Sequence, residues 1–69
     1  MMSLDTDLYG NDPLMTTVEV AEYLAIPLQS LYMLRHRRQG PPAIKIGAAT
    51  IRFRKSEVDA WLTQNAERA

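Results

Sequence analysis

The spacing of the apolar residues changes along this chain, and the change restricts the folds open to it. Between residues 16 and 38 apolar side chains recur every three or four positions, the spacing of an amphipathic helix. Between residues 43 and 54 they alternate with polar residues, as in a strand with one buried face. Helical spacing returns from residue 55. The pattern therefore predicts a mainly α domain with one small β-hairpin.

A proline divides the first helical segment into two helices. Thr16 and Glu19 fit a capping box, in which each side chain accepts an amide of the first turn, so a helix is predicted over residues 17–24. Pro27 has no amide hydrogen and is tolerated in the first turn of a new helix, predicted over about 27–38 and ended by a glycine and two prolines. Two short helices joined by two or three residues indicate a helix-turn-helix.

The alternating segment predicts the hairpin, and a third helix follows it. The strands are expected over 43–46 and 51–54, joined by residues 47–50, where a glycine is free to adopt positive φ. The third helix is expected over about 55–65, with Trp61 in the core. The order α-α-β-β-α is that of a winged helix-turn-helix.

The chain divides into three parts. We expect a flexible acidic segment over 1–13, the folded domain over 14–63 and a flexible tail over 64–69.

The composition of the chain excludes several classes of protein. With no cysteine and one histidine, the chain has no disulfide and is expected to hold no metal or other cofactor. It shows no nucleophile–base pair and no glycine-rich phosphate loop, so we do not expect an enzyme. No apolar run is long enough to span a membrane, and the acidic start does not fit a secretory signal, so a cytoplasmic protein is expected.

Charge is sorted along the chain, although the net charge is zero. From Asp5 to Glu22 there are five acidic residues and no basic one. From Arg35 to Lys55 there are seven basic residues, together with His36, and no acidic one. A basic block without counter-charges indicates a surface that faces phosphates, whereas the simpler interpretation is a solvated face.

The side of the second helix opposite Leu31 and Leu34 is the predicted reader of DNA. Gln29 could bond an adenine edge and Met33 could contact a thymine methyl, although Met33 is more often plain helix surface. Tyr32 could equally lie against the hairpin, and a solvated histidine is the commoner state of His36. The predicted recognition residues are Gln29, Ser30, Tyr32, Met33, His36 and Arg37.

A second set of residues is predicted to hold the phosphate backbone. Lys45, Arg52 and Arg54 alternate with apolar residues, so they are expected to share one face of the hairpin and make it a wing. Arg35 and Arg38 emerge at the edges of the second helix, with phosphates or Glu22 as partners. The whole set is Arg35, Arg38, Lys45, Thr50, Arg52, Arg54 and Lys55.

Residues 14–62 resemble the excisionase-type winged helix-turn-helix domains related to the MerR-type fold. The shared stretches are 15–24, which open the first helix, 39–42 after the second, and 51–62 at the end of the domain. The resemblance implies a recognition helix in the major groove of double-stranded DNA and a wing in the neighbouring minor groove. It also implies roles among phage excisionases and small prophage transcription regulators. The leading hypothesis is a phage excisionase that binds adjacent attachment sites and directs an integrase toward excision. Because one chain has a single small recognition surface, cooperative binding with further copies is expected.

The chain departs from that family at three positions. Ala25 stands where glycine is usual, so a less sharp turn is expected. Pro27 replaces a serine-type cap, and Leu28 replaces an early polar residue of the recognition helix. Two other functions stay open: a small transcription regulator that uses the same surface, and a protein-interaction module whose basic block docks an acidic partner.

Overall fold

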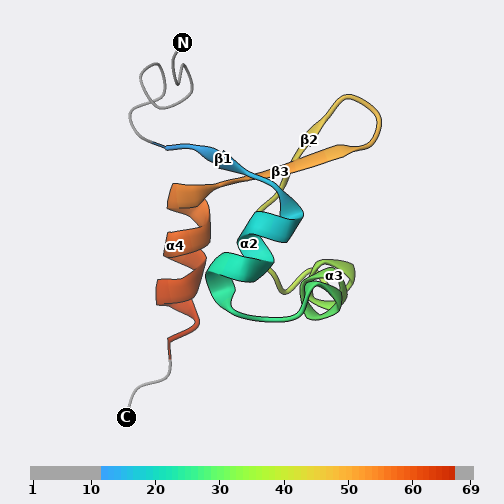
Figure 1. The fold of residues 1–69 in the computed structure, drawn as a ribbon. Helices are drawn as coiled ribbons and strands as arrows, with labels where there is room; N and C mark the ends of the chain where they lie inside the picture. The colour runs from blue at the N-terminus through green and yellow to red at the C-terminus, as the bar shows by residue number, and fades with distance from the viewer. Residues whose placement is uncertain (1–11, 67–69) are drawn as a thin grey trace.

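A computed structural model describes residues 12–66 and has the winged helix-turn-helix architecture that the sequence predicts (Figure 1). The elements in chain order are β1 (Leu14–Met15), α2 (Thr17–Leu24), α3 (Leu28–His36), β2 (Ile44–Ile46), β3 (Thr50–Arg54) and α4 (Lys55–Gln64). The predicted helices and hairpin are confirmed, and β1 is additional. The predictions of flexibility for residues 1–11 and 67–69 lie outside the described residues.

The three strands form one antiparallel sheet in the order β1-β3-β2. The short strand β1 pairs Leu14 with Arg54 and Met15 with Phe53. Two residues are too few to show an alternating period, which is why the sequence did not predict this strand.

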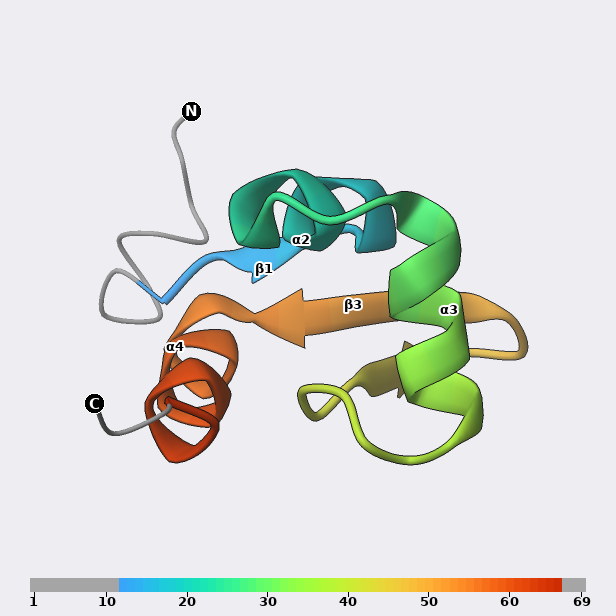
Figure 2. The ribbon, with the colours of Figure 1, turned by 90° about the horizontal axis from the view of Figure 1, so that it is seen from below.

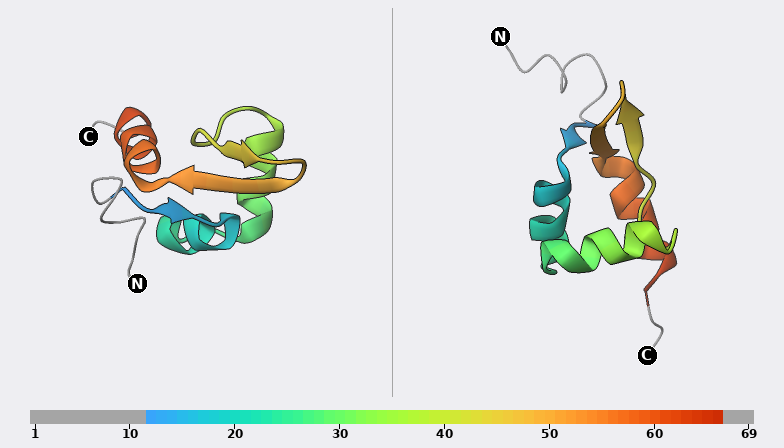
Figure 3. Two further views of the ribbon diagram at one scale, coloured as in Figure 1. Left: turned by 90° about the horizontal axis from the view of Figure 1, so that it is seen from above. Right: turned by 90° about the vertical axis from the view of Figure 1, so that its right-hand side faces the viewer.

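The described helices pack on one face of the sheet, and none of them covers the other face. Seen from below, α3 passes in front of β3 (Figure 2), and seen from above it passes behind (Figure 3, left). The core between these layers consists of Val20, Ala21, Leu31, Phe53 and Val58. The three helices and the central strand all contribute to this small core, so α3 shares one core with the strand β3 that forms half of the hairpin.

The capping box of α2 forms as predicted. The Thr16 amide donates to Glu19 Oε1 at 2.8 Å, and the Glu19 amide donates to Thr16 Oγ1 at 3.1 Å. At the other end Ala25 has φ 59° and ψ 41°, the left-handed conformation that favours glycine. The expected loss of sharpness is therefore not seen, because the alanine adopts the geometry of the glycine it replaces.

Helix α3 ends two residues earlier than predicted, and the residue that turns the chain at its end is Arg38, not the glycine. Its last helical residue is His36, and Arg38 takes the left-handed conformation with φ 58°. The Gln39 amide then donates to the Leu34 carbonyl at 2.9 Å, which closes the helix end. Gly40 is needed for another reason: a Cβ there would lie 3.3 Å from Cβ of Leu34. At the start of α3, Pro27 makes no side-chain capping bond, as expected.

The start of α4 is capped by a residue far away in the sequence. Its own N-cap residue Arg54 makes no side-chain bond. Instead, the Asp12 carboxylate accepts the Ser56 amide at 2.8 Å and the Ser56 hydroxyl at 2.9 Å. The bond from the Ser56 amide is the main reason why the pKa of Asp12 lies below its usual value. The end of the predicted lead-in is thus bonded to the folded domain.

Trp61 lies outside the core cluster, contrary to the prediction. Its ring is half-buried, and its indole N–H donates to the Gln39 carbonyl at 3.1 Å. Val58, one turn earlier, is the residue of α4 that lies in the core cluster. Trp61 therefore ties α4 to the segment that follows α3.

Candidate nucleic-acid interface

Helix α3 presents a continuous face to solvent on the side away from the core. Leu31 is fully buried and Leu34 half-buried, and together they fix the rotation of the helix. The opposite side surrounds an open hollow of about 560 Å³, lined by Gln29, Tyr32, Met33, His36 and Arg37. All of the predicted recognition residues except the half-buried Ser30 line this hollow. The side of the helix opposite Leu31 and Leu34, which the sequence predicts as the exposed side, is therefore the exposed face of α3.

No acidic side chain of residues 12–66 neutralises the basic residues at the end of α3. Arg35, Arg37 and Arg38 are all exposed. Within residues 12–66 the one ion pair joins Lys55 to Asp59, so Glu22 pairs with none of these arginines. The exposed face of α3 thus ends in three uncompensated positive charges, which suits a phosphate partner.

The register of the hairpin places the wing cations on two faces, not one. Opposed residues share a face of an antiparallel sheet, and here Lys45 opposes Ile51 while Arg52 opposes Ile44. The expected turn over 47–50 would have paired Lys45 with Arg52. The observed turn has three residues, 47–49, and this shift of one position moves the side chains of β2 to the other face. The prediction of one shared basic face is therefore wrong.

The two faces of the wing have different surroundings. Lys45 is exposed and lies on the face of Ile51 and buried Phe53, the side of the sheet on which α3 packs (Figure 2). Arg52 and Arg54 lie on the face that no described helix covers (Figure 3, left). Arg52 Nη1 donates to the Ile51 carbonyl at 2.8 Å, so that side chain is partly held against the backbone.

The bare face of the wing also carries Ile46, which the sequence did not assign to the surface. Thr50 is exposed and opposes Ile46, which is 47% exposed. The alternating pattern assigned Ile46 to the core, because periodicity alone does not say which face of an edge strand is covered. At the turn, Gly47 has φ +67°, the positive value that the hairpin was expected to require.

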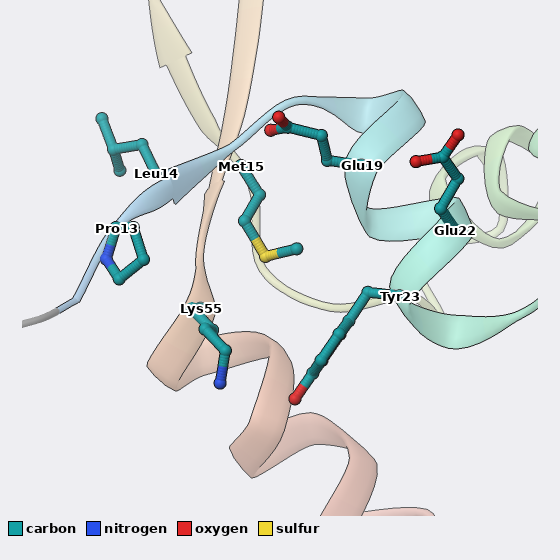
Figure 4. A pocket seen from close by; sticks show the side chains of 7 residues that line it. All are labelled: Pro13, Leu14, Met15, Glu19, Glu22, Tyr23 and Lys55. Carbon is teal, nitrogen blue, oxygen red and sulfur yellow. The ribbon is translucent and has the colours of Figure 1, made fainter.

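Lys55 points away from both α3 and the wing. It lines a second open hollow, of about 510 Å³, between β1, α2 and α4, together with Glu19, Glu22 and Tyr23 (Figure 4). Its Nζ lies 3.0 Å from Asp59 Oδ2 and 5.2 Å from the centre of the Tyr23 ring. The bond to Asp59 is the main cause of the raised pKa of Lys55. The structure therefore places this predicted phosphate ligand on the acidic side of the molecule.

Asp59 completes a small polar cluster there. The Tyr23 hydroxyl donates to Asp59 Oδ1, and this bond, followed by the one from Lys55, lowers the pKa of Asp59. The cluster joins α2 to α4. Its members bond to one another, which is what a structural link requires.

The described residues form neither a metal site nor a membrane-spanning helix. Within 12–66, no group of three or more His, Cys, Asp or Glu side chains could hold a metal ion. No helix in the same range is long and apolar enough to cross a membrane.

Comparison with known proteins identifies the domain. A family model described as a helix-turn-helix domain matches residues 14–66. The match covers both helices of the motif, the wing and α4. No curated protein matches the chain.

Proposed function

We propose that this chain, which belongs to the helix-turn-helix domain family, is a phage or prophage excisionase. That family includes excisionase-like DNA-binding domains, and the helix-turn-helix supports sequence-specific DNA binding. In this role the protein binds attachment-site DNA and directs an integrase toward excision, while the integrase performs the strand exchange. It acts in the cytoplasm of the bacterial host, where the DNA and the integrase are.

The observation that carries the proposal is the exposed face of α3. It combines an amide, a thioether, a phenol, an imidazole and a guanidinium around one hollow, and uncompensated arginines follow it. Hydrogen-bonding and apolar groups at the centre of a helix suit base edges, and cations at its end suit the phosphates beside them.

The two-faced wing supports the same proposal. A minor groove has a phosphate backbone on each side and is about 6 Å wide. A ribbon with Lys45 on one face and Arg52 and Arg54 on the other can neutralise both backbones when it enters such a groove edge-on. A wing with cations on one face would hold only one backbone.

An excision reaction tests the proposal directly. Purified protein is added to attachment-site DNA and the phage integrase, and recombination is followed on a gel beside a shift assay on the same DNA. We expect several adjacent sites to be occupied and excision to be stimulated. Site-specific binding without stimulation would instead identify a transcription regulator, whose operator a genomic footprint would locate.

The salt dependence of binding separates DNA recognition from docking of an acidic protein. Four to six phosphate contacts predict a slope of log K against log[salt] of roughly −4 to −5. A flat response, with little affinity for DNA at about 0.15 M salt, would contradict DNA binding. The proposal includes contacts of the protein with the integrase and between adjacent copies of the protein. Footprints recorded with added integrase, and with increasing amounts of the protein, test these two contacts.

A further inference from the structure

Two large apolar side chains stand on the face of α3 that would enter the major groove. Met33 is 48% exposed and Tyr32 is 51% exposed. Both line the hollow of α3, beside Gln29, His36 and Arg37. A helix that only binds phosphates needs polar and charged residues alone. The exposed Tyr32 and Met33 side chains therefore suggest that the partner also presents an apolar group.

The position of Met33 brings it to the middle of the exposed face. Gln29, Met33 and Arg37 are spaced four residues apart and form one stripe, with about 6 Å between successive residues along the axis. Met33 thus lies between an amide that can bond a base edge and a guanidinium that can bond a base or a phosphate. A stripe that meets base edges at Gln29 also brings the thioether to base edges, one or two base pairs further on.

The major groove offers such a side chain one apolar group. Guanine, cytosine and adenine present hydrogen-bond donors and acceptors there, whereas thymine presents its 5-methyl group beside one acceptor. A thioether donates no hydrogen bond and accepts only weakly. Against a donor or acceptor it would remove water without replacing the lost bond, which is unfavourable.

We propose that Met33, flanked by the Tyr32 ring, reads a thymine methyl group in the DNA target. The target then contains a thymine opposite the centre of α3, next to the base pair that Gln29 bonds. This inference rests on the proposed DNA-binding function and names the base chemistry that the same face selects.

Replacing thymine by uracil tests the inference, because it removes the methyl group and keeps the Watson–Crick pair. The preferred duplex is first selected from a random pool with the purified chain. Each thymine of that duplex is then replaced in turn by uracil, and Kd is measured. We expect one or two adjacent positions at which affinity falls about fourfold, the value for burying one methyl-sized group.

Three variants assign the effect to its residue. Met33→Ala should bind the thymine duplex more weakly and the uracil duplex with no further loss. Tyr32→Phe keeps the ring and should retain the uracil effect. Leu62→Ala, a similarly exposed apolar residue on α4 at 41% exposure, should change neither affinity. Met33 lies on the surface, and a thermal unfolding curve checks that the variants are folded.

The outcomes distinguish this inference from the proposed function. A selected site whose affinity is the same with uracil at every position would overturn the thymine contact and leave DNA binding intact. A uracil effect that persists in Met33→Ala would also overturn it, because another residue would then read the methyl group. If no duplex is selected at all, the proposed function fails, and the inference fails with it.

Discussion

Substitutions on α3 should affect DNA binding, whereas a substitution at the start of α4 should affect the stability of the fold. Gln29 and Met33 are exposed and contribute nothing to the core cluster, so their substitution should change DNA binding and leave stability unaltered. Asp12 lies on the other side of the fold and bonds only to α4, so its substitution should change stability and leave binding unaltered.

Gln29→Ala should weaken binding to the specific site by about 1–3 kcal/mol, the range for a bidentate contact to a base. Affinity for unrelated duplexes and the salt slope should stay the same, since no phosphate contact is lost. Titrations on specific and scrambled DNA check this. An equal loss on both would mean that Gln29 bonds the backbone.

Asp12→Asn should lower the unfolding temperature at neutral pH by a few degrees. Its pKa is lowered in the folded state, so its ionised form stabilises the fold above the ordinary value of 3.8, and the contribution disappears as the pH falls through the lowered pKa. Melting curves of wild type and variant should therefore converge in acid, once the pH is below the lowered pKa of Asp12. Ser56→Ala keeps the amide bond to Asp12 and should have a smaller effect. A difference that persists in acid would mean that the carboxylate charge is not the cause.

At the scale of elements, the hairpin shows how a turn decides what a strand presents. One residue fewer in the turn moves Lys45 from the face of Arg52 and Arg54 to that of Ile51. The same sequence pattern thus allows two wings, one basic on a single face and one basic on both. The second is observed, and it makes a separate prediction for each face.

Lys45→Ala and Arg54→Ala should each lower the salt slope of DNA binding by about one, and the double variant by about two. The reason is that each cation would neutralise a different backbone of one groove. Glu57→Gln, on α4, is the control for a changed charge outside the wing. If only one of the two single variants changed the slope, the wing would lie flat on one backbone.

At the scale of the whole molecule, a small core has to hold α3 and the wing, the two proposed DNA-binding elements, in register. Phe53 of β3 is fully buried, and its strand contacts both α2 and α4. The recognition helix and the wing have no other large shared support among the described residues. Loss of this core should therefore remove DNA binding as well as stability.

Phe53→Ala should destabilise the fold by about 3–5 kcal/mol, which is as much as a core of this size provides. We expect a largely unfolded chain at 25 °C by circular dichroism, with no specific DNA binding. Arg54→Ala, the exposed neighbour on the same strand, should remain folded. A cooperative, near-native melting curve for Phe53→Ala would show that the core is not the main source of stability.

The charge distribution also belongs to this scale. The chain has zero net charge, yet α3 and the wing carry uncompensated cations, while Glu19 and Glu22 border the hollow beside Lys55 (Figure 4). The net charge would predict indifference to DNA. Folding separates the two signs, so DNA would meet the positive side only.

The sequence by itself determined the positions of the three helices and the hairpin, and the face that α3 exposes. Capping boxes, prolines and apolar spacing act within a few residues, so they can be read without the fold. Only the tertiary structure decided the pairing of β1, the cap of α4 by Asp12, the contact of Lys55 with the Tyr23 ring and the two faces of the wing. The first three depend on contacts between residues far apart in the chain, which no local pattern encodes. The last depends on a turn longer or shorter by one residue, and either length fits the alternating pattern equally well until the core selects which strand face is buried.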